Sequence, residues 1–165
     1  MHQRNSEGEH PAQAFSTTRG YGLEAPVRTS KQILIADDDP VTVHMLSGVL
    51  EGGGFDVTVA VDAMQAVMMA MRKLPAAIIL DIGMPGGGGF QVLERLRASP
   101  KTKAIPIIVV TALNDPALPA HVRALGANEF LRKPVAADML RTILDRLLGD
   151  PPAEKSRPLP PPNTA

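Results

Sequence analysis

Four apolar segments of the chain end in residues whose side chains could take part in metal or phosphoryl chemistry. The segments and the residues that follow them are Ile33–Ala36 with Asp37, Asp38 and Asp39, Ala76–Leu80 with Asp81, Ile105–Val110 with Thr111, and Phe130–Arg132 with Lys133. If the segments are parallel strands of one sheet, their carboxyl ends lie at the same edge. Carboxylates, a hydroxyl and an ammonium would then share one rim, a combination that suits a divalent metal ion and phosphoryl transfer.

The spacing between these segments predicts an α/β fold. Short strands rich in Ile and Val alternate with helical patterns, which favours a five-stranded parallel doubly wound sheet flanked by five helices. The predicted strands are Gln32–Ala36, Phe55–Val61, Ala76–Leu80, Ile105–Val110 and Glu129–Leu131, and the predicted helices are Val41–Leu50, Ala63–Leu74, Phe90–Ala98, Ala120–Leu125 and Ala136–Leu148. In the flavodoxin-like order 2-1-3-4-5, the ligand site lies between the first and third strands, where Asp38 and Asp81 stand.

The acidic triplet taken alone supports two interpretations equally well. Asp39 before Pro40 is a good helix cap, and the neighbouring carboxylates could equally bind a metal ion. Convergence of three acids at one rim favours metal binding over capping, because like charges about 4 Å apart cost roughly 1 to 4 kcal/mol per pair. A cation would relieve that repulsion. Oxygen ligands in a chain without cysteine favour Mg²⁺ over zinc.

Composition excludes several classes of function. The 165 residues are 44% hydrophobic and carry a formal net charge of zero, so nothing in the overall charge predicts nucleic-acid or membrane binding. No apolar run approaches the roughly 20 residues of a membrane span, and the N-terminus lacks the apolar core of a signal peptide. The absence of cysteine fits a reducing compartment. We therefore expect a cytoplasmic protein with no direct nucleic-acid contact.

Both ends differ in composition from the middle. Residues 1–30 lack apolar periodicity, and residues 150–165 are rich in proline, so both are predicted to be disordered, leaving 31–149 as the folded domain. The proline-rich tail is interpreted as a solvated end or a linker. The less favoured alternative is a segment that binds an aromatic groove of another protein.

Four motifs at these strand ends resemble the receiver domain of bacterial two-component response regulators, in particular the single-domain, chemotaxis-regulator-like members. They are ILIADDDP at 33–40, LDIGMPGGGGF at 80–90, PIIVVTA at 106–112 and FLRKP at 130–134. The separations of 43, 30 and 22 residues along Asp38, Asp81, Thr111 and Lys133 also match that family. The resemblance covers 119 of the 165 residues.

The resemblance implies a role for each residue at the predicted rim. Asp81 would accept a phosphoryl group from a phosphohistidine of a sensor histidine kinase or a histidine phosphotransfer protein. Asp38, Asp81 and the Gly83 carbonyl would hold Mg²⁺, with Asp37 acting through a metal-bound water. Lys133 would pair first with Asp81 and then with a phosphoryl oxygen.

The resemblance also implies a switch. Thr111 would donate its hydroxyl to the phosphoryl group, and Ala112 would leave room for that group. Phe130 occupies the position of the family's mobile aromatic residue, although an ordinary core aromatic explains it equally well. The Lys133–Pro134 bond would be cis, as in the family.

The chain departs from the family pattern in three places. Glycine replaces the usual carboxylate at position 88, which predicts a flexible loop, or else only Gly89 has a required backbone role. Pro116 and Pro119 predict a late and short fourth helix. The positions that influence the hydrolytic water in the family are Gly83 and Leu113, which cannot orient one, so we expect a long-lived phosphorylated form.

Two further points remain open at this level. Met64, Met68 and Met71 form a stripe that is interpreted as core in preference to a binding surface. The favoured function is a stand-alone phosphorylation-dependent switch and not a turnover enzyme. The alternatives are the front piece of a longer regulator with a DNA-binding or cyclase domain and, less favoured, a scaffold that is not phosphorylated.

Overall fold

The computed structural model of the chain describes residues 30–85 and 88–149. The segments predicted to be disordered, 1–30 and 150–165, lie outside the described residues apart from Ser30. Within the described part, strands and helices alternate along the whole length.

Every predicted strand and helix is present, with small differences at the ends. The strands are β1 Gln32–Ala36, β2 Asp56–Ala60, β3 Ala77–Leu80, β4 Ile107–Thr111 and β5 Glu129–Arg132. The helices are α1 Pro40–Gly52, α2 Ala63–Lys73, α3 Gly88–Ala98, α4 Leu118–Ala124 and α5 Ala137–Leu148.

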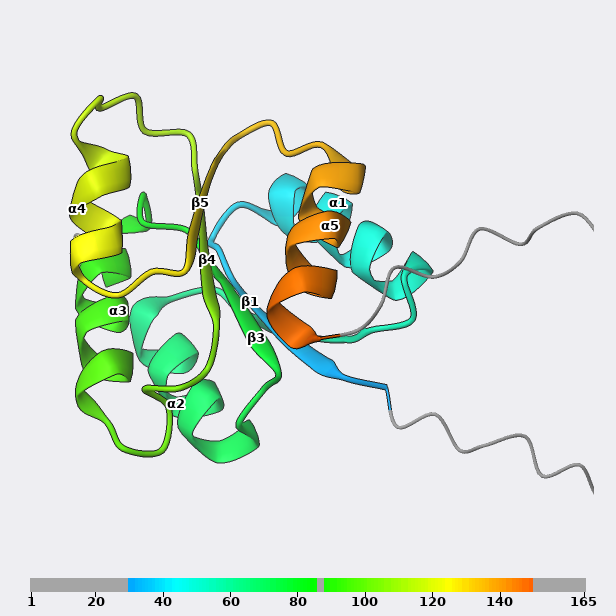
Figure 1. Cartoon of the computed structure of the whole chain (residues 1–165), viewed down its shortest axis with the longest axis horizontal. Coiled ribbons are helices and arrows are strands. Elements are labelled where there is room, and N and C mark those ends of the chain that lie inside the picture. The colour runs from blue at the N-terminus through cyan, green and yellow to red at the C-terminus, as the bar shows by residue number, and fades with distance from the viewer. Residues whose placement is uncertain (1–29, 86–87, 150–165) are drawn as a thin grey trace, which may run out of the picture.

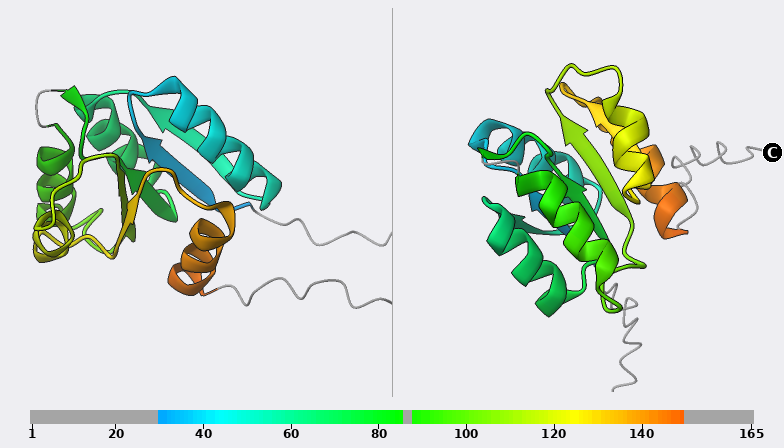
Figure 2. Two further views of the ribbon diagram at one scale, coloured as in Figure 1. Left: turned by 90° about the horizontal axis from the view of Figure 1, so that it is seen from above. Right: turned by 90° about the vertical axis from the view of Figure 1, so that its left-hand side faces the viewer.

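The strands form one parallel sheet in the order β2-β1-β3-β4-β5, which confirms the predicted topology. Helices α1 and α5 lie on one face of the sheet, and α2, α3 and α4 lie on the other (Figure 1). The two further views in Figure 2 show the same three layers. Because all five strands run the same way, their carboxyl ends share one edge.

Alternation along each strand divides the core into two clusters. Ile33 and Ile35 pack with residues of α1 and α5, whereas Leu34 and Ala36 pack with residues of α2, α3 and α4. We call these clusters the α1/α5 core and the α2–α4 core. Both faces of the central strands are therefore buried, as expected for a parallel sheet.

Helix α4 is short, as its prolines predict. It contains 7 residues, and Pro119 lies in its first turn, where a proline costs no helical hydrogen bond. The Asp115 carboxylate accepts a hydrogen bond from the Ala117 amide at 2.9 Å just before the helix.

Close backbone contacts fix the start of α3. A Cβ atom on Gly89 would lie 2.4 Å from the Ile82 Cα, so this position requires glycine. A Cβ atom on Gly88 would lie 2.8 Å from the Ala63 Cβ at the start of α2. The required backbone role of Gly89 is therefore confirmed, but Gly88 has a packing role of its own, because it permits the close approach of α2 and α3.

The interpretation of the methionine stripe as core is also wrong. Met64, Met68 and Met71 are exposed to 79%, 45% and 38%, while Ala66 and Ala70 on the opposite side of α2 are fully buried. Small side chains let α2 lie close to the sheet, so the larger ones point outward. Both stripes have helical spacing, and the sequence alone does not show which one faces inward.

Among residues 30–85 and 88–149, no helix combines the length and the apolar character needed to cross a membrane.

The contacts of Gly89 predict a difference between two glycine substitutions. Gly89→Ala should lower the free energy of unfolding by about 1–3 kcal/mol, because the added methyl group meets backbone atoms that cannot move aside. Gly48→Ala in α1, where a Cβ atom meets nothing within 4 Å, should instead be neutral or stabilise the fold by about 0.5–1 kcal/mol. Urea unfolding of both variants measures the difference, and equal effects would contradict the analysis.

Candidate functional site

Three carboxylates meet at the carboxyl ends of β1 and β3. One oxygen each of Asp37, Asp38 and Asp81 can be chosen so that all lie within 4.8 Å of one another. Asp37 and Asp81 are buried, whereas Asp38 is exposed. A cleft of about 390 Å³ beside α1 is lined by Asp37 and Asp38, so the cluster can be reached from solvent.

Lys133 joins the two buried acids. Its ammonium group donates to the Asp37 Oδ2 at 2.7 Å and to the Asp81 Oδ2 at 3.1 Å. The Lys133 amide also donates to the Thr111 carbonyl at 2.9 Å, which ties the start of the following loop to β4. The Lys133–Pro134 bond is cis, as predicted.

The pKa shifts follow from burial and from this pairing. Burial raises the pKa of Asp37 above its ordinary value, and the nearby Asp81 charge adds to the rise, although the bonds from Lys133 and the Asp39 amide oppose it. Burial alone would lower the pKa of Lys133, but hydrogen bonds to Asp37 and Asp81 and their charges raise it. The ammonium form of Lys133 is therefore favoured between the two carboxylates.

Asp39 acts as the N-cap of α1. Its carboxylate accepts from the Val41 and Thr42 amides at 3.1 and 3.2 Å and from the Thr42 hydroxyl at 2.6 Å. Hydrogen bonds from the Thr42 hydroxyl and the Val41 amide lower the pKa of Asp39, and the Thr42 amide and the Lys133 charge add smaller contributions in the same direction. Capping therefore accounts for the third acid of the triplet, while the first two face the rim.

Asp81 is held on both of its oxygens. Oδ1 accepts from the Gly83 amide at 2.7 Å, and Oδ2 accepts from Lys133. The Asp81 amide donates to the Ala36 carbonyl at 2.8 Å, which fixes the end of β3 against β1. A Cβ atom on Gly83 would lie 3.2 Å from the Asp81 Oδ1 and 3.5 Å from the Thr111 Oγ1. Gly83 therefore borders both groups without filling the space near them.

Thr111 and Phe130 lie on the other side of the sheet from Lys133. Thr111 is fully buried, and its Oγ1 accepts from the Leu113 amide at 3.3 Å. Phe130 is partly buried and packs against the α2–α4 core. The structure thus gives Phe130 a packing role and leaves the alternative of a mobile aromatic residue untested.

The donor set fits a divalent cation. Carboxylate oxygens from Asp37, Asp38 and Asp81 are the ligands that Mg²⁺ prefers, and the Asp38 side chain is open to solvent. Three carboxylates and one ammonium leave a formal charge of −2 on the cluster. A divalent ion would balance that charge, so the residues present suit a magnesium site.

Sequence reasoning missed one contact at this site. Lys133 pairs with Asp81 at 3.1 Å, as expected, but it also pairs with Asp37 at the shorter distance of 2.7 Å, and that second contact was not expected. The signal was present in the alternation of the strands. Asp37 is two residues after Ile35, so its side chain lies on the same side of the sheet as those of Ile33 and Ile35. Lys133 is likewise two residues after Leu131. Ile33, Ile35 and Leu131 all belong to the α1/α5 core.

Comparisons with known proteins agree with the fold and the geometry. Residues 33–145 match the family model described as the response regulator receiver domain. The Protein PilH of Pseudomonas aeruginosa is 33% identical over 118 residues, which cover 72% of this chain and 98% of that protein. The Response regulator PleD of Caulobacter vibrioides is 38% identical over 111 residues, or 67% of this chain, but the match spans only 24% of PleD.

A solved structure gives the same result and bears on the metal site. The receiver domain of the sensor histidine kinase PA1611 from Pseudomonas aeruginosa superposes with a TM-score of 0.65 at 32% identity, covering 73% of this chain and 98% of that one. That structure contains a magnesium ion coordinated in its active-site cleft. The family model matches most of the chain, and the fold and the acidic rim agree with it. The chain therefore belongs to the response regulator receiver family of two-component signalling.

Proposed function

We propose that this receiver is a phosphorylation-dependent switch in which Asp81 accepts a phosphoryl group from a phosphohistidine. The observation that carries the proposal is the setting of Asp81 at the rim. One of its oxygens is held by the Gly83 amide and the other by Lys133, beside two further carboxylates. An ammonium and a cation site next to a carboxylate nucleophile are what phosphoryl transfer requires.

In the proposed reaction, an Asp81 oxygen forms a bond to phosphorus while the bond from phosphorus to the imidazole nitrogen of the donor breaks. The leaving imidazole keeps the electron pair of that bond and takes up a proton. Negative charge then increases at a rim that already carries buried acids. Lys133 offsets this charge by moving its hydrogen bond from Asp81 to a phosphoryl oxygen, while its bond to Asp37 holds it in place.

Asp37, Asp38 and Asp81, with the Gly83 carbonyl, would hold Mg²⁺ at this rim. A bound Mg²⁺ would supply electrostatic stabilisation of the charge on the transferred group. In this proposal Asp38 and Asp81 are direct ligands and Asp37 is secondary, because Asp37 makes the shorter bond to Lys133, 2.7 Å against 3.1 Å for Asp81.

The switch part of the proposal rests on Thr111. Its hydroxyl oxygen accepts a bond from the Leu113 amide, so its own hydrogen remains available to donate to a phosphoryl group on Asp81. Thr111 is buried on the side of the sheet that carries the α2–α4 core, and a movement of Thr111 toward that group would open space beside this core, against which Phe130 packs. We propose that Phe130 responds to this movement.

The phosphoryl donor in this proposal is a sensor histidine kinase or a histidine phosphotransfer protein. The chain catalyses only its own phosphorylation and slow dephosphorylation, so it is a signalling module and not a turnover enzyme. The chain has no cysteine, which fits a reducing cytoplasm as its location.

A second candidate is that the receiver controls an attached output domain, such as a DNA-binding or cyclase domain. The observation that favours it is that the match spans about a quarter of the length of PleD. Determining the reading frame that surrounds the receiver in its source genome would distinguish this candidate from a stand-alone switch.

Asp81 should be the single phosphorylated residue. Incubation with acetyl phosphate and Mg²⁺ should add one phosphoryl group to the wild-type chain and none to Asp81→Asn, as measured by intact mass. EDTA should suppress the reaction, because the uncompensated acids repel the donor. Labelling of Asp81→Asn, or labelling that EDTA does not reduce, would refute the assignment.

Mg²⁺ affinity should depend on Asp38 and not on Asp39. Asp38→Ala removes a direct ligand and should weaken binding by roughly tenfold or more, since even changes outside the ligand shell cost that much. Asp39→Ala should leave the affinity nearly unchanged and lower the unfolding temperature, because it removes the α1 cap. Isothermal calorimetry and thermal unfolding measure the two effects. Equal losses of affinity would show that the roles of the two acids are wrongly assigned.

The phosphorylated form should be long-lived. Gly83 has no side chain, and Leu113 is apolar and 45% exposed, so neither can position a water molecule for attack on the phosphoryl group. Gly83→Asn and Leu113→Glu should each accelerate dephosphorylation severalfold. The decay of phosphorylated protein after removal of the donor measures this. Loss of the phosphoryl group within seconds in the wild type, or no acceleration in either variant, would contradict the explanation.

A further inference from the structure

Thr42, in the first turn of α1, is a buried polar residue that the proposed reaction does not use. Its exposed fraction is only 6%. It lies three residues after Asp39, the N-cap of α1, and its hydroxyl donates to the Asp39 Oδ2 at 2.6 Å. An N-cap side chain is defined by the bonds that it accepts from backbone amides of the first turn, so the hydroxyl bond is an addition to the cap.

This added bond is shorter than the two amide bonds to the Asp39 carboxylate. The Val41 and Thr42 amides donate to that carboxylate at 3.1 and 3.2 Å. A hydrogen bond from a hydroxyl to a carboxylate is stronger than one between neutral groups. The hydroxyl bond is also the largest cause of the lowered pKa of Asp39. The position of the Asp39 side chain therefore depends chiefly on Thr42.

Asp39 in turn connects this bond to the acidic rim. Its amide donates to the Asp37 Oδ1 at 2.9 Å, and the Lys133 ammonium donates to the Asp37 Oδ2 at 2.7 Å. Both oxygens of Asp37 are held, so the plane of its carboxylate is fixed. One chain of hydrogen bonds thus runs from the Thr42 hydroxyl through two aspartates to Lys133. The Lys133 ammonium also donates to Asp81 at 3.1 Å, so the chain of bonds ends beside the proposed phosphoacceptor.

We propose that Thr42 is a positioning residue for phosphoryl transfer to Asp81, an inference that rests on the function proposed above. In that reaction the Lys133 ammonium moves from Asp81 to a phosphoryl oxygen while Asp37 holds it, so the Asp37 carboxylate is the pivot of the movement. A carboxylate held on one oxygen alone could turn about its Cβ–Cγ bond and carry the ammonium with it. Thr42 prevents this by fixing Asp39, whose amide holds the second oxygen of the pivot.

The short connection between β1 and α1 passes the effect of Thr42 on to the pivot. It consists of residues 37–39. Its first residue is anchored to β2, because the Asp37 amide donates to the Ala60 carbonyl at 3.0 Å. Its third residue is anchored to α1 through the cap bonds of Asp39, of which the bond from the Thr42 hydroxyl is the shortest. A weaker cap would let the Asp39 amide shift relative to Asp37, whose backbone stays on the sheet.

The first test compares two substitutions of Thr42 in the full chain, with acetyl phosphate as the phosphoryl donor and saturating Mg²⁺. Thr42→Val has nearly the same shape but no hydroxyl, and it should lower the maximal rate of Asp81 phosphorylation by about three- to tenfold. Thr42→Ser keeps the hydroxyl and should restore most of that rate. The concentration of acetyl phosphate that gives half the maximal rate should change little, because Thr42 acts on the transfer step and not on binding of the donor.

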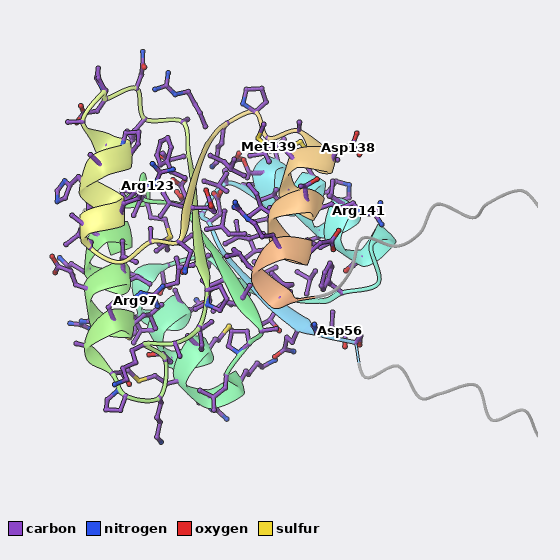
Figure 3. The ribbon with its side chains drawn as sticks, viewed as in Figure 1. Asp56, Arg97, Arg123, Asp138, Met139 and Arg141 are labelled. Atoms are coloured by element: carbon purple, nitrogen blue, oxygen red, sulfur yellow. The ribbon has the colours of Figure 1, made fainter. Side chains whose placement is uncertain are left out.

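The matched control is Thr102→Val. Thr102 is also buried, and its hydroxyl donates to the Leu96 carbonyl at 2.8 Å. Leu96 belongs to α3 and precedes Arg97, which Figure 3 shows on the other face of the sheet from α1. Thr102→Val should lower the unfolding temperature without changing the phosphorylation rate. A loss of rate caused by general destabilisation would instead appear in Thr102→Val as well as in Thr42→Val.

A double-mutant cycle with Lys133 tests the route of the effect. In a Lys133→Ala background, Thr42→Val should cause no further loss of rate, because the group that Thr42 positions is gone. The same fold loss with and without Lys133 would overturn the inference.

Two further outcomes of the rate measurements would also overturn it. They are equal rates in the wild type and Thr42→Val, and a rate in Thr42→Ser as low as that in Thr42→Val. In each of these cases the wild type is still labelled at Asp81, so the proposed function stands. A wild type that acetyl phosphate does not label would overturn the proposed function and this inference with it.

Discussion

The site depends on the balance between two buried carboxylates and one ammonium group. Asp37 and Asp81 are removed from water at the ends of neighbouring strands, and the Lys133 ammonium lies between them. Two buried carboxylates without a cation would repel each other and lose hydration, which makes the shared ammonium a condition for the local fold as well as for chemistry. Three acids against one base still leave excess negative charge. The same balance therefore stabilises the free protein and leaves a net negative charge that suits a divalent ion.

Strand alternation determines which groups can meet. By strand alternation, Asp37, Asp81 and Lys133 lie on the side of the sheet that carries the α1/α5 core. Thr111 and Phe130 lie on the side that carries the α2–α4 core. The rim thus lies over both faces of the sheet. A group attached to Asp81 would contact Lys133 from one side and the Thr111 hydroxyl from the other. In the proposed switch, Thr111 would connect chemistry at the rim with the α2–α4 core, against which Phe130 packs.

Much of this arrangement could be predicted from the sequence, because it depends on strand ends and turn residues. The cap at Asp39 and the short α4 after Pro116 follow from local rules, whereas the order of the strands follows from the fold class that the alternation of strands and helices predicts. The contacts that were missed depend on how elements approach one another. The Asp37–Lys133 bond joins residues 96 positions apart, and the role of Gly88 depends on its distance from Ala63. Strand alternation places Asp37 and Lys133 on the same side of the sheet, but neither of these two distances is contained in a local pattern.

The orientation of α2 also could not be predicted from a local sequence pattern, and the reason is energetic. Burying three methionines would remove more apolar surface from water than burying Ala66 and Ala70, so hydrophobicity alone favours the wrong face. The alanine face wins because it allows α2 to approach the sheet and Gly88 closely, and Met69 and Met84 already pack with the α2–α4 core. Close packing of the whole layer outweighs the burial of one stripe. The exposed methionines are then the cost of that packing.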